Sequence, residues 1–403
     1  MTKIRILLFL LTIIIVGIGG YIALLYARGY RVNPDSGKIT PHGLFVIKSS
    51  PNAAQLFINN ELKTATDATL SLTPGSYQVE IKKEGYKTWS KNIQIKQEEV
   101  TEINASLFKS APSLSALTFS GSINPVASPD LSKIVYAVRP ANRADYTQKA
   151  GLWVIETINL PIGFSREPKR IADGDLSEAS WMWSPDGREV LVTTNTGAYL
   201  FNAGTFTSQS QRINVATTKT TILSGWKEDE DKILQSKEKN LPEELKSILQ
   251  TKAQSVLFSP DENMLLYTAS GSATLPEDLI KHLPGSSTQT EDRKIETGKT
   301  YVYDIKEDKN FLVDTDSSNL VLGSQTDGAE SKKIMWFPNS LNLVVSEKDK
   351  ITIMDYDGTN PQVIFTGGFI NPYVFTTVSA DRLLILTDLG GNESANLYTL
   401  TIK

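Results

Sequence analysis

The most strongly apolar stretch of the chain runs from Ile6 to Tyr26 and contains no charged residue. At 1.5 Å per residue, a helix of this length is about 30 Å long, which matches the hydrocarbon core of a bilayer. Such a helix has no polar face, so it does not fit the surface of a soluble domain. The pattern predicts a transmembrane helix within residues 1–30, with membrane contact through residues 6–26.

A cleaved signal peptide is the alternative for this stretch. The apolar region of a signal peptide is normally about 7–15 residues and ends at a small-x-small cleavage site. Here the run is longer and ends at Ala27-Arg28, so an uncleaved signal-anchor is favoured. Basic residues flank both ends (Lys3 and Arg5 before, Arg28 and Arg31 after), which leaves the positive-inside comparison close to a tie. We expect the exported orientation, because a single N-terminal anchor before a long body normally exports that body.

Apolar and polar residues alternate with period two after a linker over residues 31–42, which includes the spacer 33–37. Tyr77, Val79 and Ile81 lie on one side of a predicted strand and polar residues on the other. Turn residues separate the runs: Asn59-Asn60 suits a hairpin, and Pro74-Gly75 suits a type II turn with Gly75 at positive φ. Gly85 suits another left-handed corner. The pattern predicts four to six short strands in a small β-sandwich over residues 43–108.

A second pattern repeats from about Leu114 to the C-terminus. Each copy has a hydrophobic strand, a Ser-Pro-Asp turn and a strongly apolar strand, where Pro fixes φ and Asp caps the corner. A strand-turn-strand unit that recurs every few tens of residues is typical of a β-propeller. The turns are Ser128-Pro129-Asp130, Ser184-Pro185-Asp186 and Ser259-Pro260-Asp261, with degenerate copies at Phe337-Pro338-Asn339 and Ser379-Ala380-Asp381.

The spacing of the turn prolines exceeds a blade of about 40–45 residues, so the propeller over 114–403 must contain insertions. Residues 241–249 and 275–280 each predict a short helix with proline at the first position and acids in the first turn. The polar tract 285–298 predicts a loop. Together these lengths predict about six blades, within a range of five to seven. The last blade lacks a fourth strand, and residues 114–119 are predicted to supply it and close the ring.

Composition narrows the possible functions. The chain has 403 residues, no cysteine and two histidines, which excludes disulfides, thiol catalysis and Cys- or multi-His-ligated metal sites. Residues 109–403 hold 29 basic and 37 acidic residues, so the main body is acidic and a nucleic-acid partner is not expected. Neither a phosphate-binding Gly-x-x-x-x-Gly-Lys-Ser/Thr loop nor a His-Glu-x-x-His helix occurs.

Acidic clusters are the first candidates for chemistry. A calcium loop needs alternating oxygen ligands closed by a bidentate carboxylate. Asp355-x-Asp357-Gly358 has the opening of such a loop, but Thr366 occupies its twelfth position, so a blade turn is favoured. Asp314-x-Asp316 is interpreted as a solvated loop, and the acidic run 228–231 as a solvated face.

Histidines and tryptophans are the remaining candidates. A Ser-His-Asp hydrolase would need His42 or His282, and no Gly-x-Ser-x-Gly elbow accompanies either. A glycosidase carboxylate pair stays open, because such carboxylates meet only in space. Four tryptophans could stack on sugars, but packing between blades is the favoured interpretation (Trp153, Trp181, Trp183 and Trp336). The sequence predicts no catalytic, cofactor-binding or metal-ligating residue and no cofactor.

Residues 43–108 resemble the PEGA domain, a small surface-associated bacterial β module. The resemblance depends on Pro51-Asn52-Ala53-Ala54 in place of the eponymous tetrapeptide, and on Pro74-Gly75-x-Tyr77 and Gly85-Tyr86-x-x-Trp89. It implies an extracytoplasmic location, a non-catalytic role as spacer or wall contact, and no site residues.

The later repeats resemble those of the TolB-type propeller, a relative of WD-type repeats. The Ser-Pro-Asp-Gly turn at 184–187 and the strand end Met354-Asp355-Tyr356-Asp357-Gly358 carry this resemblance.

The favoured reading is an all-β, single-pass membrane protein with an extracytoplasmic body that acts as a non-enzymatic binding or scaffold protein. Its expected partner is a protein or the cell wall, contacted through the propeller face, and no small-molecule substrate is identified. Two alternatives remain: an envelope sensor or assembly factor that acts with a membrane partner, and a glycan-active enzyme with a site at the propeller mouth.

Overall fold

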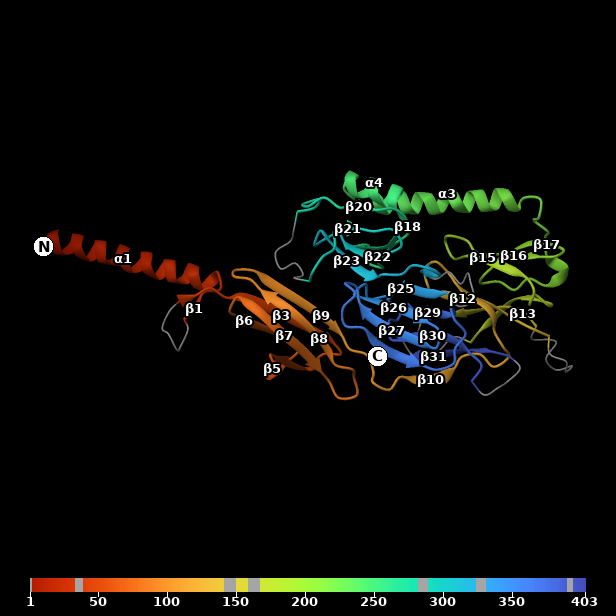
Figure 1. Ribbon diagram of the computed structural model, residues 1–403, viewed down its shortest axis with the longest axis horizontal. Coiled ribbons are helices and arrows are strands. Elements are labelled where there is room, and N and C mark those ends of the chain that lie inside the picture. Colours follow the sequence, from red (N-terminus) through yellow and green to blue (C-terminus); the bar gives the residue numbers. More distant parts are fainter. Residues whose placement is uncertain are drawn as a thin grey trace. The chain divides into compact units, whose positions relative to one another are not determined.

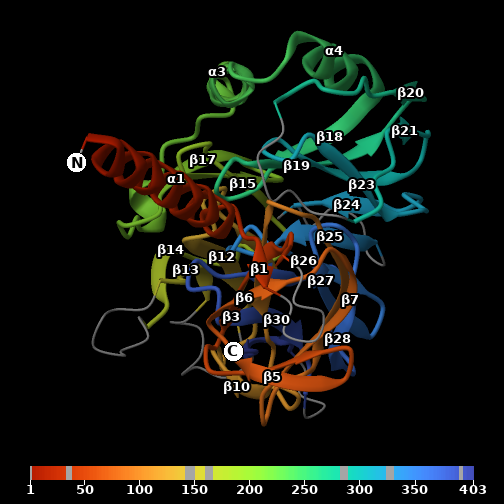
Figure 2. The same cartoon turned by 90° about the vertical axis from the view of Figure 1, so that its left-hand side faces the viewer.

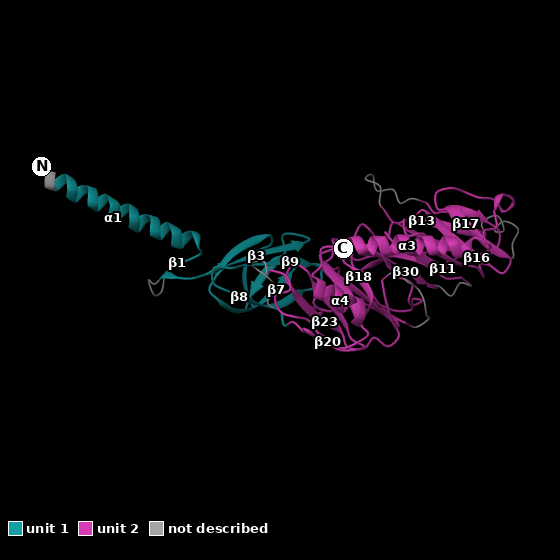
Figure 3. Cartoon of the chain, turned by 90° about the horizontal axis from the view of Figure 1, so that it is seen from above, with its two compact units in different colours: residues 1–107, 282–290 teal, residues 108–281, 291–403 magenta. Residues whose placement is uncertain are grey.

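The computed structural model describes residues 2–32, 39–140, 150–158, 167–281, 289–323, 331–389 and 394–403. The predicted spacer at 33–37 and His282 lie outside these residues. The chain divides into two compact units, residues 1–107 with 282–290 and residues 108–281 with 291–403 (Figure 3). Each unit is described by itself below.

The first unit begins with one long helix, α1 (Thr2–Ala27). Within it, Ile4–Ala27 has a mean hydropathy of 2.7 and none of this span is buried by the rest of the protein (Figure 1). The helix is therefore long and apolar enough to cross a membrane, as the uncharged run predicts. A two-stranded ribbon of β1 (Arg31–Val32) and β2 (Ile39–Thr40) follows it.

Two sheets face each other in the rest of the first unit. One sheet has the order β6-β3-β9 and the other β5-β4-β7-β8, so the sandwich has seven strands, more than the four to six predicted. Its buried core includes Phe45, Ile47, Leu56, Val79 and Ile81. The strands are β3 (Gly43–Ser50), β4 (Gln55–Ile58), β5 (Glu61–Ala65), β6 (Ala68–Leu72), β7 (Gly75–Lys82), β8 (Trp89–Ile95) and β9 (Val100–Ser106).

Two of the three turns predicted for the sandwich have the predicted backbone conformation. Asn59 and Asn60 have φ of 50° and 66°, as a tight hairpin requires, and Gly85 has φ of 80°. Gly75, in contrast, is not in the left-handed region and begins β7, so the predicted type II geometry is wrong there. Gly43 is needed for a different reason: a Cβ at this position would lie 2.3 Å from the carbonyl oxygen of Lys96.

The second unit is a β-propeller whose described residues form five sheets of three to five strands, the blades, and one two-stranded ribbon. Blade 1 contains β11 (Ile123–Ala127), β12 (Lys133–Val138), β13 (Gly151–Glu156) and β14 (Lys169–Asp173); blade 2 contains β15 (Ser180–Trp183), β16 (Glu189–Thr194) and β17 (Gly197–Asn202). Blade 3 contains β18 (Ala253–Phe258), β19 (Met264–Ala269), β22 (Thr300–Asp304) and β23 (Lys309–Asp314). Blade 4 contains β24 (Leu320–Leu322), β25 (Lys332–Trp336), β26 (Asn342–Glu347), β27 (Lys350–Asp355) and β28 (Gln362–Thr366). Blade 5 contains β29 (Val374–Thr376), β30 (Arg382–Thr387), β31 (Asn396–Thr401) and β10 (Ser113–Ala116).

The Ser-Pro-Asp turns form the predicted corners. In the first two copies the serine hydroxyl donates to the aspartate two residues later, at 2.6 Å in each, and the aspartate accepts a backbone N–H at 3.1 Å. The serine oxygen also accepts the N–H five residues later, which fixes the start of the next strand. The hydrogen bond from Ser184 lowers the pKa of Asp186, so this corner keeps its charge.

The ring closes as predicted. β10 pairs with β31 in antiparallel register, Leu114 opposite Leu400, and forms the outer strand of the C-terminal blade. The chain then crosses to blade 1 through Thr118, whose Oγ1 accepts the N–H of Leu397 at 2.9 Å and donates to Asn396 Oδ1 at 3.0 Å. The first strand of the repeat region therefore covers an edge of the last blade.

Hydrophobic clusters join neighbouring blades. Separate buried cores connect blades 1 and 2, blades 1 and 5, blades 4 and 5, and blades 3 and 4. Blade 3 also packs on α4 (Glu243–Lys252) through Leu245 and Leu249. This helix confirms the one predicted over 241–249, with Pro242 at the N-cap.

A helical insertion occupies the chain between blades 2 and 3. After the 3-10 turn η1 (Gln209–Gln211), α3 (Lys219–Glu238) lies along both blades (Figures 1 and 2). Lys219 Nζ donates to Thr193 of blade 2 at 2.9 Å, and Lys237 pairs with Glu262 of the blade 3 turn at 3.1 Å. The described residues thus give five blades and a helix pair, so the choice of six is not confirmed.

The insertion between β19 and β22 differs from the sequence prediction. No helix forms over 275–280; Leu275 is buried and Asp278 has φ of 56°. Of the predicted loop 285–298, residues 285–288 lie outside the described residues. The rest is not simply a loop, since β21 (Lys294–Ile295) pairs with β20 (Ala273–Thr274) and Ile295 is fully buried. The apolar residues of this insertion pack on blade 3, which overrides the local helix signal.

Candidate functional site

Asp355 and Asp357 take part in a blade turn. Asp355 Oδ1 accepts the side-chain amide of the buried Asn342 at 3.0 Å, and Asp357 Oδ1 accepts both the N–H and the hydroxyl of Thr359. These oxygens face protein donors, as the blade-turn interpretation predicts.

The other acidic clusters are also engaged locally. Asp314 is not in a solvated loop as interpreted: it ends β23, its side chain is 9% exposed, and it pairs with Lys332 at 2.8 Å. Asp316 is exposed and accepts the N–H of Ser318 at 2.9 Å. The hydrogen bonds from Ser318 lower the pKa of Asp316. The run 228–231 lies on the exposed part of α3, where Lys227 and Lys232 form i,i+4 pairs with Asp231 and Glu228. Among the residues that the structure describes, no three His, Asp or Glu side chains come together as a metal site would require.

The predicted histidines do not form a triad in the described part of the chain. His42 Nδ1 lies 3.1 Å from Ser71 Oγ in the sandwich, and no carboxylate contact orients its ring there. His282 lies outside the described residues. The pairing of one histidine with one serine alone lacks the third group of a nucleophilic site.

The tryptophans lie in blade strands, as predicted. Trp183 Nε1 donates to the carbonyl of Val126 in blade 1 at 2.9 Å, and Trp336 Nε1 donates to the carbonyl of Leu257 in blade 3 at 3.2 Å. Trp181 is buried in the core between blades 1 and 2. Trp153 is different, because it is only partly buried and lines a cavity described below.

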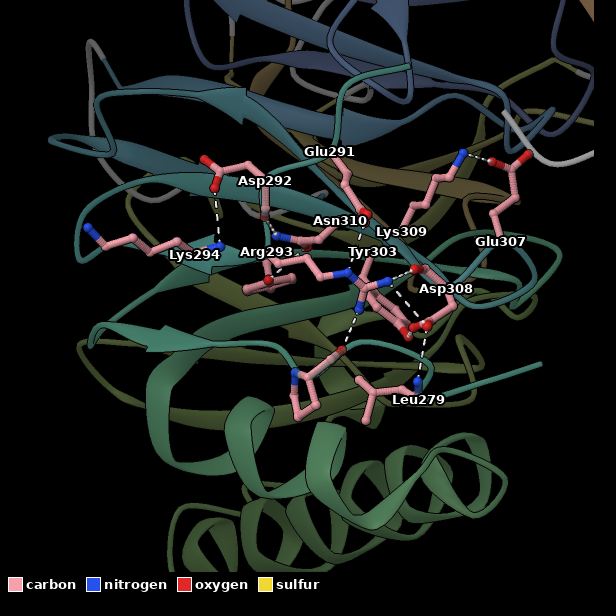
Figure 4. A network of polar contacts seen from close by, with 12 residues as sticks. Leu279, Glu291, Asp292, Arg293, Lys294, Tyr303, Glu307, Asp308, Lys309 and Asn310 are labelled. Atoms are coloured by element: carbon pink, nitrogen blue, oxygen red, sulfur yellow. Dashed lines mark hydrogen bonds and ion pairs between the residues drawn. The ribbon is translucent and has the colours of Figure 1, made fainter. Parts of the chain in front are cut away.

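A buried polar network holds the blade 3 insertion (Figure 4). Asp308 is fully buried, and its carboxylate accepts the hydroxyl of Tyr303 at 2.5 Å, the N–H of Leu279 at 3.0 Å and an ion pair from Arg293 at 3.2 Å. Asn310 accepts the hydroxyl of Tyr267 at 2.9 Å. Burial raises the pKa of Tyr303, which therefore stays a donor. With both carboxylate oxygens occupied, the network is a clamp rather than a reactive site.

A cavity of about 540 Å³ opens beside the ring closure, within the second unit. Its lining comes from the crossover segment after β10 and from strands β12 and β13. Three aromatic side chains, Phe119, Tyr136 and Trp153, contribute to its walls together with Leu117, Val138 and Glu167. Cavities of roughly 300–1,000 Å³ with mostly apolar walls and a few polar groups are typical of ligand sites.

Tyr136 and Glu167 have no protein partner among the described residues, and Ser120 adds a hydroxyl to the lining of this cavity. Tyr136 is 3% exposed, and no hydrogen bond joins its hydroxyl to any residue in the described ranges. Burial raises its pKa, so the hydroxyl is neutral at physiological pH. Glu167 is exposed, and no described cation pairs with it. The Tyr136 hydroxyl reaches the open cavity, where water can pair with it.

Sequence reasoning missed this cavity. Its residues are widely separated in sequence and meet only because β10 closes the ring and then crosses to blade 1. Phe119 is the last residue of the predicted outer strand 114–119, but β10 ends at Ala116 and Phe119 is 83% exposed in the structure.

The fold therefore defines a protein with one membrane-length helix, a seven-stranded sandwich and a propeller. The family model of the PEGA domain matches residues 42–111, so this part of the chain is a PEGA domain, as its motifs predicted. A search of curated proteins found no match.

Three solved structures are similar to this chain, each with a low TM-score. A putative TolB from Agrobacterium tumefaciens is 11% identical, with a TM-score of 0.22, and the match covers 70% of this chain and 78% of that one. TolB from Acinetobacter baumannii is 12% identical, with a TM-score of 0.19, and covers 81% of this chain and 59% of that one. Oligogalacturonate lyase from Vibrio parahaemolyticus is 11% identical, with a TM-score of 0.22, and covers 92% and 96%.

Proposed function

We propose that this protein is a membrane-anchored, extracytoplasmic binding scaffold that presents its propeller to another component of the cell envelope. The observation that carries the proposal is the order of parts in one chain. An uncharged helix of membrane-spanning length leads, after a short ribbon, into a PEGA domain and then a propeller. PEGA domains are associated with the cell exterior, so the orientation that fits is cytoplasmic N-terminus and exported body.

The proposed role is non-catalytic. Its support is that Asp355 and Asp357 form a blade turn, the run 228–231 forms ion pairs along α3, and Trp183 and Trp336 form contacts between blades. Binding rather than chemistry also suits the cavity beside the ring closure, because a single exposed carboxylate and a neutral tyrosine offer recognition without a paired acid and base.

Membrane extraction tests the anchor. The chain should stay in the membrane pellet after a carbonate wash, whereas Ile14→Arg should release a large fraction, since a charge at the centre of a spanning helix costs about 2.5–3.5 kcal/mol. Ile14→Leu is the matched control and should behave as the native protein. Release of the native chain by carbonate, or retention of both variants equally, would contradict a spanning helix.

A further inference from the structure

The chain reverses direction where α1 ends. Gly29 has φ of 93°, and its N–H donates to the carbonyl of Tyr26 at 3.1 Å. The next N–H, of Tyr30, donates to the carbonyl of Leu25 at 3.0 Å. This pair of hydrogen bonds is a Schellman motif, which ends a helix at a residue in the left-handed conformation. The helix therefore stops at Ala27, next to the last residue of the uncharged run.

The ribbon of β1 and β2 is held at this end of the helix. The N–H of His42, two residues after β2, donates to the carbonyl of Gly29 at 3.2 Å, so the segment that contains the ribbon begins and ends at the helix terminus. Arg31 in β1 reaches back along the helix. Its Nη1 donates to the carbonyl of Tyr26 at 2.8 Å, and its Cζ lies 3.8 Å from the centre of the Tyr26 ring. The ribbon therefore lies beside the last turn of α1 (Figure 1).

One face of the ribbon is apolar and exposed. Val32 and Ile39 are directly paired across the two strands, so their side chains lie on the same face. They are 65% and 50% exposed. Two adjacent aliphatic side chains are stabilised where an apolar environment removes them from water.

Continuity with α1 indicates which environment that is. With α1 across a membrane, the uncharged run of about 30 Å fills the hydrocarbon core, so Tyr26 marks the level at which the core meets the headgroups. Tyrosine is enriched at that level, and Tyr26 is 63% exposed. Arg28 comes next and is also exposed, as a contact with lipid phosphates requires. A ribbon held beside Tyr26 lies at the same level and brings its apolar pair to the acyl chains nearest the headgroups.

A protein partner is the alternative occupant of this face. A protein interface of standard size buries about 800 Å² on each side, and a ribbon of four paired residues offers far less. A bilayer needs no extended, shaped surface, because it covers any apolar side chain that lies at the right depth. The bilayer is therefore the occupant that the ribbon fits.

We propose that the β1–β2 ribbon is a second membrane contact, in which Val32 and Ile39 insert between the headgroups and the acyl chains of the leaflet where α1 ends. Because His42 leads directly into β3, this contact also keeps the PEGA domain close to that leaflet. The inference rests on the proposed function in one respect, namely that α1 spans a membrane.

Depth measurements on the full chain test this contact. The chain has no cysteine, so one nitroxide label at a time can be attached through Val32→Cys, Ile39→Cys, Leu62→Cys or Ile14→Cys. Leu62 is the matched control, because it is an aliphatic side chain of similar exposure, 54%, on β5 at the edge of a sandwich sheet. The labelled protein is reconstituted in vesicles of phosphatidylethanolamine and phosphatidylglycerol. Power-saturation electron paramagnetic resonance then compares collisions with oxygen, which concentrates in lipid, and with a water-soluble nickel chelate.

Labels at positions 32 and 39 should collide more often with oxygen than with the nickel chelate, at a depth between the vesicle surface and the label at position 14. The label at position 62 should show the opposite preference. Val32→Asp should shift the label of Ile39→Cys toward the nickel chelate, because a charge opposes insertion, whereas Val32→Leu should leave it unchanged. Circular dichroism confirms that each variant is folded.

Two results would overturn the proposal. Labels at positions 32 and 39 that prefer the nickel chelate, as the label at position 62 does, would show that the ribbon lies in water. Labels shielded from both reagents would show that protein covers the ribbon instead of lipid. In either case a label at position 14 that stays deep in the bilayer leaves the anchor intact. A label at position 14 that reports water would refute the anchor itself and, with it, the proposed function.

Discussion

The indole of Trp336 in blade 4 donates a hydrogen bond to the carbonyl of Leu257 in blade 3, at 3.2 Å and across 79 residues of sequence. Trp183 does the same to Val126 at 2.9 Å, from blade 2 to blade 1. Both tryptophans stand two residues before the turn proline of their blade, and both acceptors stand three residues before the turn proline of the preceding blade. The repeat therefore encodes contacts between blades as well as the shape of each blade.

Removing one of these indole hydrogen bonds should destabilise the propeller. We expect Trp336→Phe to lower the free energy of unfolding by about 1–3 kcal/mol, because the Leu257 carbonyl loses its donor and a gap opens in the packing. Urea denaturation followed by circular dichroism measures the change. The control is Trp226→Phe on α3, where no described acceptor contacts the indole; a loss as large there would contradict the inter-blade explanation.

Lys333 should make the free energy of unfolding depend on pH. Its side chain is fully buried in blade 4, where Nζ donates to the carbonyls of Pro372 at 3.3 Å and Val374 at 3.0 Å. Burial lowers the pKa of Lys333 to about 7. Between about pH 7 and pH 10 the unfolded chain keeps this proton and the folded chain does not, so stability should rise with pH by up to about 1.4 kcal/mol per pH unit.

The difference between the native protein and Lys333→Met isolates this effect from other titrating groups. The variant should be more stable than the native protein at pH 6, and the gap should shrink as the pH rises toward 10. Guanidinium unfolding midpoints at pH 6, 7, 8 and 9 provide the measurement. A gap that stays constant with pH would show that Lys333 keeps the same protonation state in both forms.

Thr118 tests the closure of the ring. Its hydroxyl accepts the N–H of Leu397 at 2.9 Å and is buried at the crossover from β10 to blade 1. Thr118→Val should cost about 1–3 kcal/mol of stability, since a buried backbone N–H loses its acceptor. Thr217→Val at an exposed position before α3 should be neutral within about 0.5 kcal/mol in the same thermal melt. Similar losses at both positions would argue against a special role for the closure.

The second compact unit begins at Phe108, a residue that the sequence prediction assigns to the end of the sandwich. Phe108 is 2% exposed and packs edge-on against Phe337 at a centroid distance of 5.8 Å, and Lys109 N–H donates to the carbonyl of Ile402 at 2.8 Å. Phe108→Ala should destabilise the full chain by about 3–5 kcal/mol. Phe119→Ala is the natural control because this ring is 83% exposed, and it should leave the melting temperature nearly unchanged.

Regular and local features could be predicted from the sequence. The uncharged run specified the helix at 6–26, the Ser-Pro-Asp turns specified the corners, and the missing strand of the last blade indicated that residues near 114 pair with β31. Each depends on residue types that act through their own backbone, such as the fixed φ of proline or the capping carboxylate of Asp186.

Features that depend on packing at a distance could not be predicted in the same way. Helix α3 has no buried residue and mostly polar side chains, so its hydrophobic pattern is weak. The segment at 275–280 has a helix-start signal, but Leu275 is buried against blade 3 and the segment does not become a helix. The cavity at Tyr136 needs three separate elements to meet, and the order of residues along the chain does not show that they do.

Protease accessibility of the propeller in intact cells tests the proposed anchored and exported scaffold. Cells or spheroplasts that carry a C-terminally tagged full chain are treated with external protease, with a cytoplasmic protein as the internal control. We expect the tag and the propeller to be degraded while the cytoplasmic control survives, and α1 with its N-terminus to stay in the membrane. Complete protection of the propeller until the cells are lysed would contradict the exported orientation and, with it, the proposed function.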